Sequence, residues 1–308
     1  MKNYTFHSGN YKPVAQFLFN SNDHIQLQSK EGWRCYYVLD KNQDCQAFIW
    51  LHLEKVRASS PLKAPFGSFE CKQGLDASIL FDFINYILQD LKNKGIRQLS
   101  IKQSIDGYLP AQNALINTLL LNHGFSIVNA EVANLIMIDP VQYETKLHDW
   151  EKRKLKQAKK EHFSFEVVKK NRLTEVYTFI ENCRAQKKYA LSMPLKDLKK
   201  LQQTIPDAIH LFSIKRNKEM IAACIAIKVS PTILYTFYYD HASPYQKISP
   251  VVMLIEGIYN FCSQNKIKIL DLGTAALQGK PNFNLLTFKQ HLGASYSTKF
   301  TFEKHLDD

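Results

Sequence analysis

The order of elements at the end of each half of this 308-residue chain limits its possible folds more than any other sequence feature. Each half ends with an amphipathic helix, a short strand, a loop, a second helix closed by glycine, and a last strand. The spacings are similar, since Ile96 and Gly124 are 28 positions apart (124 − 96) and Ile267 and Gly293 are 26 apart (293 − 267). Shared order and spacing indicate that one α/β unit has been duplicated.

The first helix of each repeated stretch has clear sequence signals. A helix is predicted over 78–94, where apolar residues at 80, 83, 84, 87, 88 and 91 follow helical spacing. Gly95 comes next, as expected for a residue that ends a helix. The matching helix is predicted over 251–265, with Pro250 in its first turn and Ser249 as its N-cap.

The rest of the chain alternates between strand and helix patterns, which predicts a mixed α/β protein. The segment 57–70 contains prolines and a glycine and is expected to be a loop. Pro140 interrupts the pattern between the halves, so we predict two domains, residues 1–141 and 142–308. Strands are expected over 34–39, 46–53, 97–102, 163–168, 210–215, 220–228, 233–239, 268–272 and 296–303, a strand pair over 125–138, and helices over 111–122, 142–161, 173–186, 195–203 and 285–291.

Composition excludes several classes of protein. Apolar residues make up 45% of the chain and charged residues 22%, which is ordinary for a globular protein. No stretch reaches the roughly 18 apolar residues of a transmembrane helix. The N-terminal stretch lacks the apolar region of a signal peptide, so we expect a cytoplasmic protein. The six cysteines form no CxxC pair and the ten histidines are scattered, so we expect free thiols and no metal.

The charge balance favours an anionic partner. Forty Lys and Arg against 28 Asp and Glu give a formal net charge of +12. Part of this excess lies in the predicted helix 142–161, where Arg153 and Lys156 accompany several other lysines. These residues form either a contact surface for the phosphates of tRNA or a lipid-linked pyrophosphate, or an ordinary solvated surface. The buried side of this helix is expected to contain Leu147, Trp150, Leu155 and Ala158.

The most specific motifs lie from Tyr238 onward. Tyr238 and Tyr239 end a strand, Ser249–Pro250 starts a helix, Asp271–Leu272–Gly273 ends the next strand, and Phe288–Lys289 is followed by Leu292–Gly293. In this combination the sequence resembles the FemAB-like branch of the acyltransferases with the GCN5-related N-acetyltransferase (GNAT) fold. The loop APFGSF at 64–69 also resembles a segment of acetyltransferases in that branch. The resemblance covers the whole chain in arrangement, but pointed motifs occur only in the last part.

The resemblance implies two tandem GNAT-like domains and an N-acyltransferase without a tightly bound cofactor. Relatives transfer an acyl group from acyl-CoA, or an amino acid from aminoacyl-tRNA to the amine of a cell-wall precursor. Such enzymes hold the amine and the carbonyl together and stabilise the oxyanion. The glycines of the usual CoA loop are absent from YQKISP at 245–250, so we expect weak CoA binding.

The donor, the acceptor amine and the oligomeric state all stay open at this point. The alternative to an enzyme is a catalytically silent GNAT-fold protein that binds tRNA or a phosphate ligand.

The resemblance also assigns roles to residues. Lys289 is implied to steady the negative charge of the transfer step, and Tyr239 could relay or donate a proton. Because alternate residues of a strand face opposite sides, one of Tyr238 and Tyr239 is expected in the core and the other, with a slight preference for Tyr239, in the cleft. His241 could act as a base there or have no role. Further residues expected to bind the donor or the substrate are Phe288, Tyr238, Lys247, Ser249, Gly273, Phe66, Gly67, Arg153 and Lys156.

Overall fold

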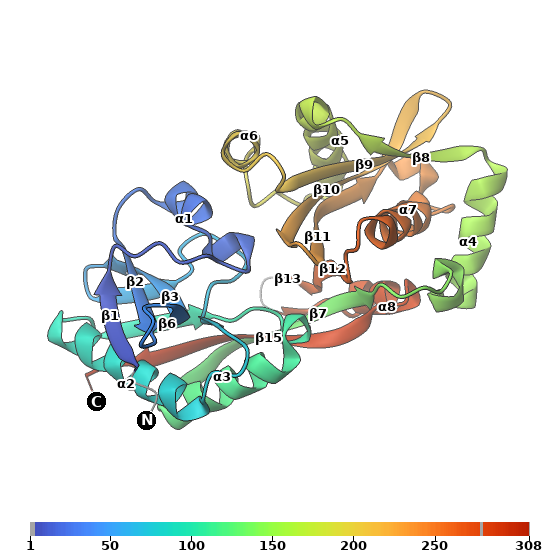
Figure 1. Cartoon of the computed structure of the whole chain (residues 1–308). Helices are drawn as coiled ribbons and strands as arrows, with labels where there is room; N and C mark the ends of the chain where they lie inside the picture. The colour runs from blue at the N-terminus through green and yellow to red at the C-terminus, as the bar shows by residue number, and fades with distance from the viewer. Residues whose placement is uncertain (1–3, 278–279, 308) are drawn as a thin grey trace. The chain divides into compact units, whose positions relative to one another are not determined.

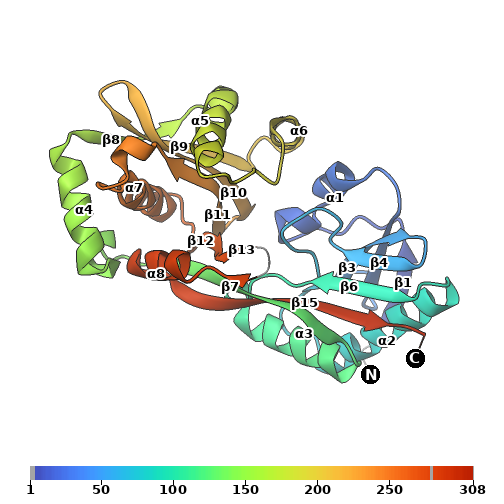
Figure 2. The same cartoon turned by 180° about the vertical axis from the view of Figure 1, so that it is seen from behind.

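The computed structural model describes residues 4–277 and 280–307. The described chain forms two compact units (Figures 1 and 2). The first unit contains the residues up to Glu131 together with those from Ser297, and the second contains Val132–Tyr296. The division falls inside strands β7 (Ser126–Met137) and β15 (Ser295–His305), so each of these strands contributes residues to both units. The predicted boundary at 141/142 concerns the duplicated sequence stretches and stays a prediction.

The first unit is a mixed sheet in the order β1-β2-β3-β4-β6-β15, with β5 paired to β3. The β4–β6 pair is parallel, and the other neighbours are antiparallel. The strands are β1 (Thr5–Gly9), β2 (Trp33–Leu39), β3 (Cys45–Glu54), β4 (Arg57–Ser60), β5 (Glu70–Cys71) and β6 (Gln98–Lys102). The helices are α1 (Asn22–Gln28), α2 (Ala77–Asn93) and α3 (Pro110–Asn122).

Alternation along β2 and β3 gives this sheet two buried faces. Tyr36 and Ile49 belong to the core shared with α2 and α3, whereas Cys35 and Phe48 belong to the cluster that contains Ile25 of α1. Helix α2 buries the predicted apolar stripe in full: Leu80, Phe83, Ile84, Ile87, Leu88 and Leu91. Burial of each such side chain stabilises the fold by roughly 1.5–3 kcal/mol.

The second unit is a mixed sheet in the order β7-β12-β11-β10-β9-β8. Helices α5 and α7 pack on opposite faces of its middle strands (Figures 1 and 2). The strands are β8 (Phe163–Val168), β9 (Ile209–Arg216), β10 (Glu219–Ser230), β11 (Ile233–His241) and β12 (Ile269–Thr274), with the short pair β13 (Ala276–Leu277) and β14 (Lys280–Pro281). The helices are α4 (Asp149–Lys160), α5 (Leu173–Gln186), α6 (Leu195–Thr204), α7 (Pro250–Gln264) and α8 (Phe283–His291).

The two repeated tails form equivalent structures. In α2-β6-α3-β7 the strand β6 has β4 as its parallel neighbour and β15 as its antiparallel neighbour. In α7-β12-α8-β15 the strand β12 has β11 as its parallel neighbour and β7 as its antiparallel neighbour. The last strand of each tail therefore completes the sheet of the other unit. Gly124 and Gly293 follow the second helices with φ of 77° and 84°, as the sequence predicts.

Several predictions of local structure are wrong. The segment 57–70 is not wholly a loop, because Arg57–Ser60 precede the first proline and pair with β6 as strand β4. The predicted strand pair over 125–138 is the single strand β7. Its neighbours β12 and β15 both come from far along the chain, and no turn divides it. Strand β1 and helix α1 were not predicted.

Helix α4 also differs from its prediction, because it begins only at Asp149, after a separate 3₁₀ turn over Tyr143–Lys146. The helical repeat from that start buries Glu151, Leu155 and Ala158, at i, i+4 and i+7. Trp150 is 56% exposed, contrary to prediction. The buried Glu151 carboxylate is compensated by Lys154, at 3.2 Å.

Candidate active site

The strands β11 and β12 diverge inside the second unit. Their parallel pairing covers Ile233↔Ile269, Leu234↔Leu270 and Tyr235↔Asp271, while β11 continues to His241 and β12 to Thr274. A cavity of about 710 Å³ is lined by the ends of both strands and by α8. This volume falls in the range of small-molecule sites, and ligands of α/β proteins commonly bind beyond the carboxyl ends of strands.

Lys289 of α8 lies at this cavity and is only 2% exposed. Its Nζ donates hydrogen bonds of 3.0 Å to the carbonyl oxygens of Gly273 and Thr274. Gly273 has φ 75°, and its N–H donates to Asp271 Oδ1 at 2.6 Å, which fixes the turn that presents these carbonyls. Burial lowers the Lys289 pKa to about 8, although the Asp271 carboxylate partly opposes the shift. An ammonium has three N–H donors, so one is left for a ligand.

Tyr238 and Tyr239 of β11 both line the 710 Å³ cavity. Tyr238 is 4% exposed, and its hydroxyl bonds Ser192 Oγ and accepts the N–H of Met193, both at 2.7 Å. Tyr239 packs against the core formed with α7 and also lines a second cavity of about 350 Å³. Burial raises the pKa of Tyr239 well above its ordinary value, so its phenol is protonated near neutral pH and can donate a proton.

Asp240, near the end of β11, lies close to three basic side chains. Its Oδ1 lies 2.5 Å from Lys187 Nζ and its Oδ2 lies 3.8 Å from Arg184 Nε. His241 Nδ1 is 3.7 Å from the same Oδ1, and burial together with Lys187 lowers the pKa of His241. Neither Arg184 nor Lys187 was predicted as a site residue. The available signal was weak, namely basic side chains near the end of the helix predicted over 173–186.

The loop before α7 presents few free amides. The N–H groups of Ile248 and Ser249 both donate to Tyr245 O, at 3.1 and 3.0 Å, and Pro250 has no N–H. The N–H of Val252 donates to Ser249 O at 3.0 Å. Ser249 is the N-cap residue of α7, as predicted, with φ 54°, but its side chain makes no cap hydrogen bond. A GNAT loop holds pyrophosphate with such amides, so this backbone does not fit the pyrophosphate of CoA.

The structure brings together only part of the predicted site. Lys289, Tyr239, Tyr238, Phe288 and Gly273 line the larger cavity, and Ser249 lines the smaller one. The exposed residues Lys247, Arg153 and Lys156 line neither of these two cavities.

The predicted residues Phe66 and Gly67 belong to the first unit. Phe66 is 2% exposed and packs edge-on against Phe17 and Phe19. A Cβ at Gly67 would lie 2.4 Å from Ser60 Oγ. Their environment is therefore a packed interior.

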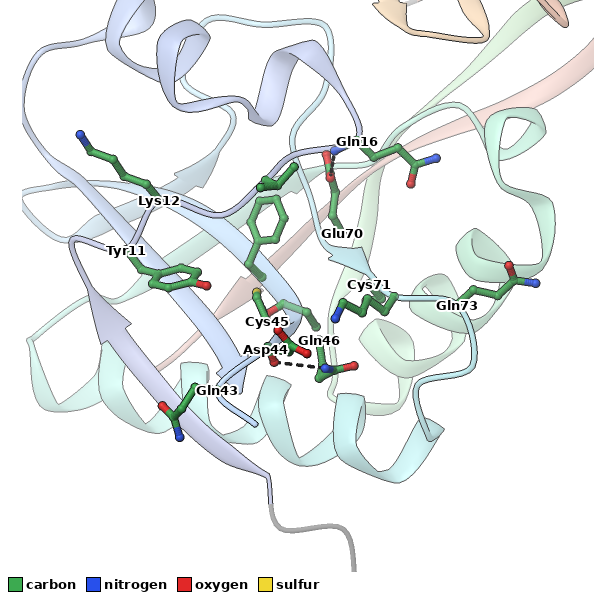
Figure 3. Close-up of a pocket in the computed structure, with 14 residues that line it drawn as sticks. Tyr11, Lys12, Gln16, Gln43, Asp44, Cys45, Gln46, Glu70, Cys71 and Gln73 are labelled. Atoms are coloured by element: carbon green, nitrogen blue, oxygen red, sulfur yellow. Dashed lines mark hydrogen bonds between the residues drawn. The ribbon is translucent and has the colours of Figure 1, made fainter. Parts of the chain in front are cut away.

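The first unit has a cavity of about 480 Å³ of its own (Figure 3). In Figure 3 the Tyr11 ring points toward Cys45, and Gln73 points away from it. Burial raises the pKa of Cys45 to about 11 and that of Cys71 to about 12, so both thiols stay protonated and are poor nucleophiles. The Glu70 carboxylate accepts hydrogen bonds from the backbone N–H groups of Gln16 and Phe17 and from Asn20 Nδ2. These thiols and this carboxylate therefore offer no reactive group at the cavity.

Among the described residues, no cluster of three or more His, Cys, Asp or Glu side chains is placed to hold a metal ion. No helix in the described ranges is long and apolar enough to cross a membrane.

Solved structures share this fold over most of the chain. FemX is 12% identical and covers 94% of this chain and 92% of its own, with a TM-score of 0.69. L-PGS from Bacillus licheniformis is 12% identical over 91% of this chain and 85% of its own, with a TM-score of 0.59. A tandem GNAT protein from the clavulanic acid biosynthesis pathway is 7% identical over 89% and 83%, with a TM-score of 0.50. No family model and no curated protein matches the sequence.

These likenesses define the class of fold. The chain has a tandem GNAT fold, as the sequence predicts. The likeness to FemX confirms the resemblance to FemAB-like proteins at the level of the fold.

Proposed function

We propose that this protein is an N-acyltransferase whose reaction takes place where β11 and β12 diverge. The observation that carries the proposal is the position of Lys289. Its ammonium is almost fully buried, is fixed by two backbone carbonyls and lies at a cavity large enough for a small molecule. A buried, preorganised cation stabilises an oxyanion far better than a solvated one.

The proposed reaction needs few protein groups. The acceptor nitrogen attacks the donor carbonyl carbon, and the carbonyl electron pair moves to the oxygen. The remaining N–H of Lys289 stabilises that oxygen. When the tetrahedral intermediate collapses, the carbonyl re-forms and the bond to the leaving group breaks. The Tyr239 phenol protonates the leaving atom, and the resulting phenolate takes up the proton that the amine nitrogen loses. Like any tyrosine near neutral pH, Tyr239 holds its phenolic proton before transfer.

The donor is proposed to be an aminoacyl ester such as aminoacyl-tRNA in preference to acyl-CoA. The support is the backbone before α7, where Ile248 and Ser249 use their N–H groups internally and Pro250 has none. FemAB-like relatives acylate amines of cell-wall precursors, and we propose an acceptor of that kind. The first unit is proposed to support acceptor binding.

The test is a transfer assay with matched donors. Purified protein is incubated with labelled aminoacyl-tRNA or acetyl-CoA and a panel of amine acceptors, and amide products are detected by mass spectrometry. We expect product from aminoacyl-tRNA, and we expect Lys289→Met but not Lys200→Met to reduce its formation. Lys200 is an exposed residue of α6 that lines neither cavity of the second unit. Ligand binding without product from either donor would instead favour the catalytically silent protein.

A further inference from the structure

The two cavities of the second unit adjoin and share one sign of charge. Their common lining includes Lys187, Tyr239, Asp240 and Phe288. Over both cavities the basic lining residues are Lys154, Arg184, Lys187 and Lys289, and Asp240 is the one acidic residue in the lining given by the described chain. An excess of cations in a partly enclosed space concentrates anionic ligands.

The cations of the smaller cavity are held in place by buried acids. Lys154 of α4 is 3.2 Å from the carboxylate of Glu151, which is 3% exposed. Lys187 lies just beyond α5 and pairs with Asp240, which is 9% exposed. Each ammonium has three N–H donors, so an ion pair with one carboxylate leaves donors for a second anion. The anchors fix these donors before a ligand arrives, which reduces the entropic cost of binding.

A third polar group of this cavity is the imidazole of His241. His241 lines the cavity, and its Nε2 is buried without a hydrogen-bond partner among the described residues. Buried polar atoms of side chains normally have a partner, and one without it commonly marks the place of a ligand or water. A phosphate group satisfies this nitrogen by donating from a P–OH or by accepting from an imidazolium N–H.

We propose that the 350 Å³ cavity is a phosphate subsite for the acyl donor, in which the side chains of Lys154, Lys187 and His241 replace the backbone amides of a glycine-rich loop. The backbone before α7 offers few amides for this purpose, because the N–H groups of Ile248 and Ser249 are used internally and Pro250 has none. The phosphate is then bound by side chains of α4, of the residues after α5 and of β11. The inference rests on the proposed function for the identity of the ligand as the donor's leaving group.

The test measures anion binding and needs no acyl transfer. Inorganic phosphate and adenosine 5′-monophosphate are titrated into the full-length protein by calorimetry, with ³¹P NMR as a second measurement. We expect saturable binding at one site that weakens as salt is added, because the contact is between charges. Equal affinities identify the phosphate alone as the bound group, and tighter binding of the nucleotide shows that the adjoining cavity takes part.

Two variants test the subsite itself. Lys187→Met leaves Asp240 beside Arg184, so the acid keeps a basic neighbour. The double variant Glu151→Gln/Lys154→Met removes a buried pair together and leaves the net charge unchanged. Each should bind phosphate about tenfold more weakly or worse, as expected for loss of a charge-assisted hydrogen bond. Lys200→Met, which removes one exposed charge from α6, should bind as the wild type does.

The outcomes separate this inference from the proposed function. Thermal unfolding of each variant establishes that the protein is folded before binding is compared. Absence of saturable binding, or equal weakening by Lys200→Met, would overturn the subsite and attribute any binding to diffuse surface charge. Phosphate binding without acyl transfer would support the subsite and contradict the proposed transferase function. Acyl transfer without phosphate binding would support the transferase function and contradict the subsite.

Discussion

Replacing Lys289 with methionine tests the proposed chemistry most directly. Methionine has a similar length and fits the same apolar path, but it lacks the ammonium. In the wild type this group is 2% exposed and donates to Gly273 O and Thr274 O at 3.0 Å. The substitution therefore removes the oxyanion donor and also leaves two carbonyls without this partner.

The expected effect on turnover is large. Loss of one oxyanion donor costs on the order of 10²–10³ in kcat, or roughly 3–4 kcal/mol. The effect on stability has two opposing parts. An unsatisfied buried carbonyl costs roughly 1–3 kcal/mol, but removing a buried ammonium also removes its desolvation penalty. The variant should therefore fold, with a small net change in the free energy of unfolding.

The pH dependence gives a second measurement on Lys289. Its folded-state pKa of about 8 lies below the ordinary value of 10.5. Activity that needs the ammonium should fall as pH rises through about 8. Between pH 8 and 10.5 the unfolded state still holds a proton that the folded state has lost. The free energy of unfolding of the wild type should then rise relative to that of Lys289→Met, by about 3 kcal/mol.

The assay combines single-turnover kinetics with thermal unfolding. Lys289→Met is compared with wild type and with Lys200→Met at pH values from 6 to about 10, the range over which the cited pKa predicts a change. A wild-type rate in Lys289→Met would refute the oxyanion role. A slow variant whose activity falls with the same pH dependence as the wild type would show that another group is responsible for that dependence.

One ligand, one substitution and one truncation test the donor and the fold. Acetyl-CoA should bind no more tightly than the micromolar range, about −8 kcal/mol, because the backbone before α7 has few free N–H groups for its pyrophosphate. A submicromolar affinity measured by calorimetry would contradict this. Gly257→Ala should destabilise the protein by about 1–3 kcal/mol in thermal unfolding, because a Cβ there would lie 2.1 Å from the Phe165 ring. A stabilised variant would contradict that reasoning. Ending the chain after Tyr296 should raise the rate of amide hydrogen exchange over Gln98–Lys102, since β15 pairs with β6. Unchanged protection would show that this pairing is dispensable.

Local elements could be predicted from the sequence where periodicity and glycine agree. The stripe of α2 is buried as its spacing indicates, and Gly95 follows with φ 73°. The hairpin of β9 and β10 turns over Arg216–Glu219 as predicted. Of the four residues predicted on the buried side of α4, Leu147, Leu155 and Ala158 are buried, but Trp150 is exposed and Glu151 is buried in its place. Hydrophobic periodicity locates only apolar residues, so it could not indicate that the charged Glu151, which pairs with Lys154, is buried.

The candidate site could be predicted only where a motif marks it. Phe288–Lys289 was identified from its motif, but nothing local in the sequence indicates that Gly273 and Thr274 accept from Lys289. The cationic lining depends on α4, α5 and β11 meeting in space, and their residues lie far apart in the chain. Arg184 was missed for that reason. Phe66, by contrast, occupies a conspicuous loop, yet it contributes to packing with neighbours that no motif names.

The last strand of each repeated stretch pairs with strands of the other compact unit. The repeated stretches end in β7 and β15, and a boundary at 141/142 keeps each strand with the helices that precede it. In the structure Met137 of β7 pairs with Ile269, and Thr301 of β15 pairs with Lys102. A cut at that boundary would leave β6 and β12 each with an unpaired edge, and an exposed edge promotes aggregation. We therefore expect that neither half folds when the chain is cut at 141/142, and a fragment without activity would not locate the reaction.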